Sequence, residues 1–275
     1  MFIGLQSFLR PFRQLPGALF GALLMVHTCH AADTAKQKPA AVPTIPLMVA
    51  EALDDQGLEA PLRPEVSRLL GYMEKSMNLR FQIQRLPIQR ITELLKEPDK
   101  LAFGMSITSE RQNYMSFSEA VFNDYIWIVT REDRQFEFNT LTDLQGKSVG
   151  IVRGVRLNDD TDRYRNVLFR VEDDPSQRGA RLKKLISGRM DCMLVNSRFS
   201  NPKEVENELN QSLIENGPVG PQADHARVRV LAKPLLIDPV HFATSKARPS
   251  ALLGKINAAI RNGQANGDIP AALRP

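Results

Sequence analysis

Apolar and polar positions form short blocks along the chain, and these blocks predict alternating strands and helices. The run Ile45–Ala50 is apolar and short, as a strand requires. From Pro64 to Met77 apolar residues recur at helical spacing, with proline in the first turn, where it is tolerated. The next blocks predict a strand over Leu79–Leu86, a short helix over Ile88–Leu95 and a buried strand over Leu101–Met105. This order predicts a mostly parallel sheet with helical crossovers.

A similar pattern continues in the middle of the chain. Phe122–Thr130 is rich in β-forming residues and contains the single tryptophan. A short apolar strand is predicted over Val149–Val152, and a helical stripe over Ala180–Ile186 is closed by a glycine. Met190–Val195 then reads as a buried strand.

The last third is less regular. From Asn201 to Asp224 the chain is polar and two Gly-Pro steps interrupt any pattern, so no element is predicted there. Strands are predicted over Val228–Leu231 and Pro234–Ala243, and a helix over Leu252–Ile260. Gly263 and Gly267 are expected to loosen the end of the chain.

The turn after the third predicted strand carries candidate chemistry. Ser106 and Thr108 offer hydroxyls and Arg111 offers a guanidinium, whose planar fork pairs well with a carboxylate. In parallel sheets ligands lie beyond the carboxyl ends of the strands, which places this turn at a cleft. An arginine at a helix start is also commonly solvated, and chemistry alone favours that interpretation.

The stretch Gly104–Arg111, followed by Met115–Ser118, resembles the signature of bacterial extracellular solute-binding proteins of family 3. These are the periplasmic receptors of polar amino-acid ABC importers, and the resemblance covers most of the mature chain. It implies an α/β, two-lobed periplasmic binding protein fold (type II). Each lobe would be a mixed, mostly parallel sheet flanked by helices, and a hinge of two crossings would join them.

The resemblance also divides the chain into domains. Phe122–Thr130 matches the first hinge crossing, Leu141–Lys147 matches the turn that opens the second lobe, and Pro234–Ala243 matches the return crossing. Lobe 1 is therefore expected to comprise residues 45–124 and 237–275, and lobe 2 residues 125–236.

The family's ligand positions are only partly kept. The resemblance implies that Arg111 grips the ligand carboxylate, helped by Ser106 and Thr108. In lobe 2, Gly154 matches a family glycine that leads into a helix whose amides meet that carboxylate. Val155 stands where a hydroxyl is usual. Arg153 is an addition, and at the cleft it would suggest an anionic or multi-carboxylate ligand; simple exposure explains it equally well.

Two further departures bear on the ligand. Asn196 falls near the place of an aspartate that often pairs with the ligand's α-ammonium in the family. A neutral amide cannot give that charge-assisted bond, so a standard α-amino acid ligand is in question. Glu51 follows the first strand, where the family has an aromatic residue; it either accepts from a cationic ligand group or is solvated. The predicted ligand-binding residues are Arg111, Ser106, Thr108, Gly154, Arg153 and Asn196.

The amino terminus predicts export. Arg10 and Arg13 precede an apolar core over residues 18–26, and a small-x-small site ends at Ala31, which is typical of a signal peptide over residues 1–31. Residues 32–44 are small, polar and proline-bearing, as in a flexible leader. A lipid anchor at Cys29 is disfavoured because the residue before it is not small. The expected location is the periplasm.

The net charge and the cysteine content argue against a nucleic-acid-binding protein and against a disulfide-stabilised one. Removing residues 1–31 takes away two arginines and no acid, so the net charge falls from +5 to +3. This balance is mild, and no basic cluster with interleaved aromatics predicts a nucleic-acid partner. Cys192 is then the single cysteine, which excludes a disulfide framework and is typical of an inert core thiol.

No catalytic constellation stands out. His225 and His241 lack metal-ligand spacing, and neither a nucleophile elbow nor a phosphate loop is present. Asp159, Asp160 and Asp162 are expected to cap a helix. The chain is therefore predicted to be a monomeric, cofactor-free binding protein, not an enzyme. It would pass a carboxylate-bearing solute to an inner-membrane ABC permease.

Two alternatives remain open at this stage. One is an enzyme resembling the periplasmic dehydratases of this scaffold, which would need a buried acid and has Glu51 as its candidate. The other is an orphan sensor or accessory protein, which the changes at Val155 and Asn196 keep in view.

Overall fold

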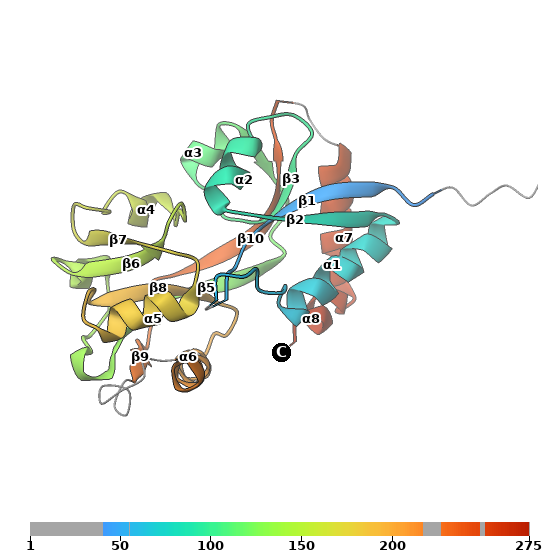
Figure 1. Cartoon of the computed structure of the whole chain (residues 1–275). Helices are drawn as coiled ribbons and strands as arrows, with labels where there is room; N and C mark the ends of the chain where they lie inside the picture. The colour runs from blue at the N-terminus through green and yellow to red at the C-terminus, as the bar shows by residue number, and fades with distance from the viewer. Residues whose placement is uncertain (1–40, 55, 217–226, 248–250, 275) are drawn as a thin grey trace, which may run out of the picture. The chain divides into compact units, whose positions relative to one another are not determined.

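Two long strands connect the two halves of the β-sheet of this protein (Figure 1). The computed structural model describes residues 41–54, 56–216, 227–247 and 251–274. These strands, β5 (Phe122–Arg131) and β10 (Leu236–Ser245), pair antiparallel. The strand order is β2-β1-β3-β10-β5-β8-β6-β7, with β4 on β10 and β9 on β5.

The first subsheet, as we call it, contains the strands before β5 and the last five residues of β10. Its central pairs are parallel: β1 (Thr44–Ala50) lies between β2 (Arg80–Leu86) and β3 (Leu101–Met105). The end of β10 adds antiparallel to β3 and to β4 (Met115–Phe117). The helices of this part are α1 (Pro64–Met77), α2 (Ile88–Leu94), α3 (Ser109–Gln112), α7 (Ala251–Ala265) and α8 (Asp268–Ala272).

The second subsheet contains β5, the first five residues of β10 and the strands between them. β6 (Ser148–Val152) pairs parallel with β7 (Arg170–Asp174) and with β8 (Cys192–Ser197). β8 and β9 (Val228–Val230) each pair antiparallel with β5. The helical elements are α4 (Asp159–Asp162), α5 (Arg178–Ile186), α6 (Pro202–Asn216) and the 3-10 turns η1 (Glu132–Arg134) and η2 (Leu141–Leu144).

Each subsheet has its own hydrophobic core. Two buried clusters, one around Phe242 and one around Met105, pack the helices of the first subsheet. Two others, around Trp127 and Phe169, do the same for the second. Of the crossing strands, only Phe122 and Val240 at their ends nearest the first subsheet join its Phe242 cluster, so β5 and β10 connect two largely separately packed parts.

Most sequence predictions of secondary structure are confirmed. The helix over Pro64–Met77 has the predicted bounds, because proline opens it and a buried stripe of Val66, Leu69, Leu70 and Met73 runs through it. The two crossing strands lie close to where they were predicted. The predicted parallel crossovers are confirmed for β1, β2 and β3, whereas the antiparallel pairs of β5 and β10 make the sheet as a whole mixed. The strand predicted from Met190 begins at Cys192 instead.

The absence of structure predicted from position 201 is wrong for Pro202–Asn216, which forms α6. Val205, Leu209 and Leu213 recur every fourth position and are buried against the second subsheet. The helix thus occupies the polar residues that precede the first Gly-Pro step in the sequence. The rest of the predicted irregular stretch lies outside the described residues.

The predicted loosening of the chain end at Gly263 is also wrong. α7 continues through Gly263 to Ala265, and α8 follows with Ile269 fully buried against α1 and α7. A Cβ on Gly263 would lie 2.6 Å from the Tyr72 hydroxyl, so this glycine permits close packing of α7 on α1. It does not loosen the chain end.

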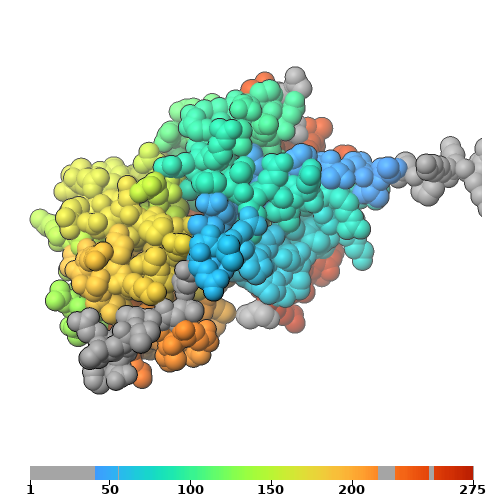
Figure 2. Space-filling model, in the orientation of Figure 1, coloured from blue at the N-terminus to red at the C-terminus, as the bar shows by residue number. Residues whose placement is uncertain are grey.

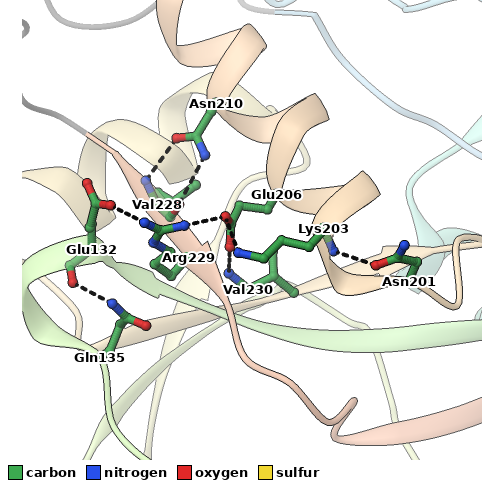
Figure 3. A network of polar contacts seen from close by, with 9 residues as sticks. All are labelled: Glu132, Gln135, Asn201, Lys203, Glu206, Asn210, Val228, Arg229 and Val230. Carbon is green, nitrogen blue, oxygen red and sulfur yellow. Dashed lines mark hydrogen bonds and ion pairs between the residues drawn. The ribbon is translucent and has the colours of Figure 1, made fainter.

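Side chains of α6 cover the free edge of β9 (Figure 3). The Asn210 amide accepts from the Val228 N–H at 3.0 Å and donates to the Val228 carbonyl at 3.1 Å. Glu206, almost fully buried, accepts from the Val230 N–H at 3.1 Å and from Arg229 at 2.7 Å. An edge strand with unpaired backbone groups invites strand addition. These bonds satisfy that edge and fix α6 on the second subsheet.

The predicted signal peptide and Cys29 lie outside the described residues, as does most of the predicted leader; β1 begins at Thr44. Within the described part of the chain, the search for membrane-crossing segments found no helix with the required length and hydropathy.

Candidate functional site

A pocket of about 600 Å³ lies at the carboxyl ends of strands from both subsheets. The ends of β1, β3, β6, β7 and β8 all reach it, as expected for ligand sites of parallel sheets. Its volume is in the range of small-molecule sites. The lining residues are Ala50, Glu51, Pro87, Ile88, Gln89, Gly104, Ser106, Arg111, Ile126, Val152, Arg153, Val155, Arg156, Leu157, Asp173, Asp174, Pro175, Ser176, Asn196 and Asp238.

Arg111 is a buried charge at the wall of this pocket. The side chain of Thr108 caps α3 by accepting the Arg111 N–H at 3.2 Å, which fixes the backbone of the arginine. Arg111 is 4% exposed, and its Nη1 donates to the Ser106 carbonyl at 3.0 Å. Burial lowers the pKa of Arg111. Among the described residues no carboxylate forms an ion pair with it, so donors of its guanidinium remain available at the pocket.

Ser106 joins Arg111 to an acidic residue that the sequence analysis missed. Its hydroxyl donates to Asp238 Oδ2 at 2.5 Å, and Asp238 comes from the crossing strand β10. Burial raises the pKa of Asp238, although the Ser106 hydrogen bond and the charges of His241 and Arg111 oppose that rise. The signal that could have revealed Asp238 is an acid within the crossing strand, directly after the apolar residues Leu236 and Ile237.

A buried ion pair shapes the opposite wall. Asp174 is fully buried and lies 3.2 Å from Arg181 Nε and 2.6 Å from Lys184 Nζ. Arg181 also donates to the carbonyl of Leu194 at 2.5 Å, which ties β7 and β8 together near the pocket. Asp174 is thus paired within the protein, and we assign it a structural role.

Of the six predicted ligand-binding residues, the structure brings four to the pocket: Arg111, Ser106, Arg153 and Asn196. The last two are exposed and come from the second subsheet. Neither side chain has a hydrogen-bonding or ionic partner among the described residues, so both are available to a ligand.

The other two predicted residues, Thr108 and Gly154, are not among the lining residues. The Thr108 hydroxyl is used by the cap of α3. Gly154 has φ of +80°, and a Cβ there would lie 2.3 Å from Gln89 Cγ across the pocket mouth. The helix that the resemblance implied after Gly154 begins only at Asp159 and has four residues.

Asp159, the first residue of the acidic run, links the two subsheets instead of capping α4. The cap is Asn158, which accepts the Thr161 N–H at 2.9 Å. Asp159 accepts the backbone N–H of Ser109, on α3, at 3.1 Å, and also its hydroxyl. Hydrogen bonds from Ser109 hold the pKa of Asp159 below its usual range.

A second close approach flanks the pocket. A Cβ on Gly57, in the loop after β1, would lie 3.1 Å from Gln177 Nε2 at the start of α5. In Figure 2 the blue surface of that loop meets the yellow surface of the α5 region. The walls of the pocket therefore approach each other at several points. No group of three metal-ligating side chains occurs among the described residues.

Comparison with known proteins agrees with this geometry. The sequence profile of bacterial extracellular solute-binding proteins, family 3, matches residues 65–274. A comparison with curated protein sequences gave no significant match.

Several solved structures share the fold. A mutant of ArgBP from T. maritima is 20% identical with a TM-score of 0.61, over 84% of this chain and 93% of that one. The GluR0 ligand-binding core from Nostoc punctiforme, in complex with L-glutamate, is 16% identical with a TM-score of 0.58, over 83% and 96%. The amino acid ABC transporter substrate-binding protein AbpA from Streptococcus pneumoniae, bound to L-arginine, is 13% identical with a TM-score of 0.59, over 84% and 92%. The fold is thus that of two-lobed periplasmic binding proteins.

Proposed function

Because the chain belongs to the bacterial extracellular solute-binding proteins, family 3, we propose that it captures a small carboxylate-bearing solute, an amino acid or related organic acid. The solute would bind in the pocket between the two subsheets. After export to the periplasm the protein would deliver it to an inner-membrane ABC permease.

The observation that carries this proposal is the state of Arg111. An arginine that is almost fully buried normally has a carboxylate partner, because an unpaired buried charge is unfavourable. The protein supplies Arg111 with one carbonyl and leaves the rest of its donor fork at the pocket. A ligand carboxylate accepting two parallel N–H bonds would complete that fork.

The similar structures support the chemical class of the ligand. Those cited above are described with arginine or glutamate bound, or as ArgBP, and one is described as an ABC transporter substrate-binding protein. The family and these neighbours are binding proteins, which favours capture over catalysis. These structures are only 20%, 16% and 13% identical to this chain, so their ligands do not identify its ligand. The residues of its own pocket must do so.

We further propose how the two lobes cooperate. Lobe 1, residues 45–124 and 237–275, would supply Arg111, positioned by Ser106 and Thr108. Lobe 2, residues 125–236, would supply Arg153 and Asn196, while Gly154 allows close approach to Gln89. A ligand that contacts both lobes stabilises the closed form by its differential affinity.

A thermal-shift screen tests the proposal. The purified protein is mixed with amino acids and small mono- and dicarboxylic acids, in parallel with Arg111→Ala. The matched control is Arg90→Ala, which removes an exposed arginine of α2 outside the pocket lining. A ligand that binds the native state raises the melting midpoint. We expect an acid-dependent shift that Arg90→Ala keeps and Arg111→Ala loses; no shift, or one indifferent to Arg111, would refute the proposal.

A further inference from the structure

The pocket contains a negative charge that the site described so far does not use. Asp238 is partly buried, lines the pocket and has one hydrogen-bond donor among the described side chains, Ser106. No described arginine, lysine or histidine lies within ion-pair distance of it. Its second oxygen, Oδ1, is therefore left to a partner from the pocket.

The position of Asp238 next to Arg111 restricts what that partner is. Arg111 donates to the backbone carbonyl of Ser106, and the hydroxyl of the same residue donates to Asp238. Ser106 thus lies between the Arg111 guanidinium, which lacks a carboxylate partner among the described residues, and the Asp238 carboxylate, which lacks a cationic one. An α-amino acid carries its carboxylate and its ammonium on the same carbon atom and so presents this pair of charges at short spacing.

The Ser106 hydroxyl fits the same assignment. Its proton is used in the bond to Asp238, so Ser106 has no hydroxyl proton to offer to a ligand carboxylate. Its oxygen retains lone pairs, which accept from an ammonium. The side chain of Ser106 therefore belongs with the cation-binding part of the pocket.

From this geometry, and resting on the proposed function, we infer that Asp238 and Ser106 form a cation subsite that selects α-amino acids over the corresponding acids without an ammonium group. Asn196, being neutral, does not supply this charge. The subsite is on the crossing strand β10, so ammonium binding would occur at the connection between the two subsheets.

Other acids at the pocket serve as comparisons. Glu51 is also partly buried and has no side-chain partner among the described residues, but no hydrogen bond connects it to the turn that holds Arg111. Asp173 is exposed, and Asp174 is paired with Arg181 and Lys184. Asp238 alone of these four is hydrogen-bonded to Ser106.

The test uses pairs of probes that differ only by the ammonium group: L-glutamate with glutarate, and L-arginine with 5-guanidinopentanoate. Affinities are measured by titration calorimetry for the wild-type protein, Asp238→Asn, Asp238→Glu and Glu51→Gln. We expect at least one amino acid to bind about tenfold or more tightly than its partner acid, the scale of a charge-assisted hydrogen bond. Asp238→Asn should remove that preference, Asp238→Glu should retain part of it, and Glu51→Gln should leave it unchanged.

The outcomes separate this inference from the proposed function. If wild-type protein binds both members of every pair equally, and Arg111→Ala abolishes binding, the cation subsite is refuted while carboxylate capture stands. A preference that survives in Asp238→Asn, or disappears in Glu51→Gln, also refutes it. If no probe and no other acid binds, both claims fail together. If Asp238→Asn does not fold, Asp238→Glu takes its place: an unchanged preference refutes the inference, and a reduced preference supports it.

Discussion

Asp159 of the second subsheet accepts the backbone N–H of Ser109 of the first at 3.1 Å, and the Ser109 hydroxyl donates to the same carboxylate. Nearby, Arg156 lies 3.7 Å from Glu110, the residue after Ser109. These contacts cross the pocket mouth beside Arg111. We interpret them as interactions that favour the closed arrangement of the two walls.

Asp159→Ala should therefore weaken ligand binding without disturbing either core. Loss of hydrogen bonds that form only when the walls approach should raise the Kd by about two- to fivefold. Because the pKa of Asp159 is lowered by its bonds to Ser109, the contact should persist at neutral pH and be lost on acidification through that lowered pKa. Calorimetry measures the change, with Asp160→Ala as the control, since Asp160 contacts Arg163 within its own turn. Equal effects of the two variants would contradict the interpretation.

Gly154→Ala should reduce affinity by preventing close approach. The new Cβ would lie 2.3 Å from Gln89 Cγ, and φ of +80° is unfavourable for alanine. Gly146→Ala is the matched control: its φ is +72°, but nothing lies within 4 Å of the Cβ position. Both variants should lose about 1 kcal/mol of unfolding free energy from backbone strain, measured by denaturant titration. Only Gly154→Ala should also lose ligand affinity; a parallel loss in Gly146→Ala would show that strain alone explains the effect.

Arg153→Ala should discriminate between classes of acid. The exposed Arg153 guanidinium at the pocket would attract a second ligand carboxylate weakly. Its removal should therefore lower the affinity for succinate or glutarate by about two- to fivefold more than the affinity for butyrate. The effect should shrink at high salt. Arg189→Ala removes an exposed arginine of the same part of the chain that does not line the pocket, and it should change nothing. Equal weakening of butyrate by Arg153→Ala would refute a second-carboxylate role.

Asp124 should make stability depend on pH. It pairs in register with Asp238 across the two crossing strands, and burial raises its pKa to about 6, although Arg63 and Arg198 oppose the rise. The native carboxyl holds its proton more tightly than the unfolded one, so its contribution to stability decreases as pH rises from about 4 through 6. As pH rises from about 4 to 7, the unfolding free energy of Asp124→Asn should increase relative to that of the wild-type protein by up to about 3 kcal/mol. Denaturant unfolding across that range measures the gain, and a pH-independent difference between the two proteins would contradict this assignment.

Much of the fold follows from local patterns. The bounds of α1 were predictable because a proline and a regular apolar stripe coincide there. α6 was missed because three buried residues in an otherwise polar stretch gave a weaker pattern than the Gly-Pro steps beyond it. The end of the chain was misjudged because Gly263 was interpreted as flexibility, whereas its role is contact with Tyr72, a residue far away in the sequence.

Four predicted residues from both sides reach the pocket, but the contacts that Ser106 and Thr108 make were not predicted. Arg111 and Ser106 lie in one continuous turn that sequence can identify. Asp238 is 132 residues from Ser106, and only the pairing of β10 with the neighbouring strands brings the two together. The use of the Thr108 hydroxyl by a helix cap also depends on backbone geometry that spacing alone does not give.

The role of Arg111 in carboxylate binding can be seen in a crystal structure of the complex with the acid that gives the largest thermal shift. The measured quantity is the distance from the ligand carboxylate oxygens to the Arg111 guanidinium. We expect two N–H···O contacts of about 2.7–2.9 Å, the range of charge-assisted bonds. A ligand carboxylate bound elsewhere, with Arg111 still donating only to the Ser106 carbonyl, would contradict it.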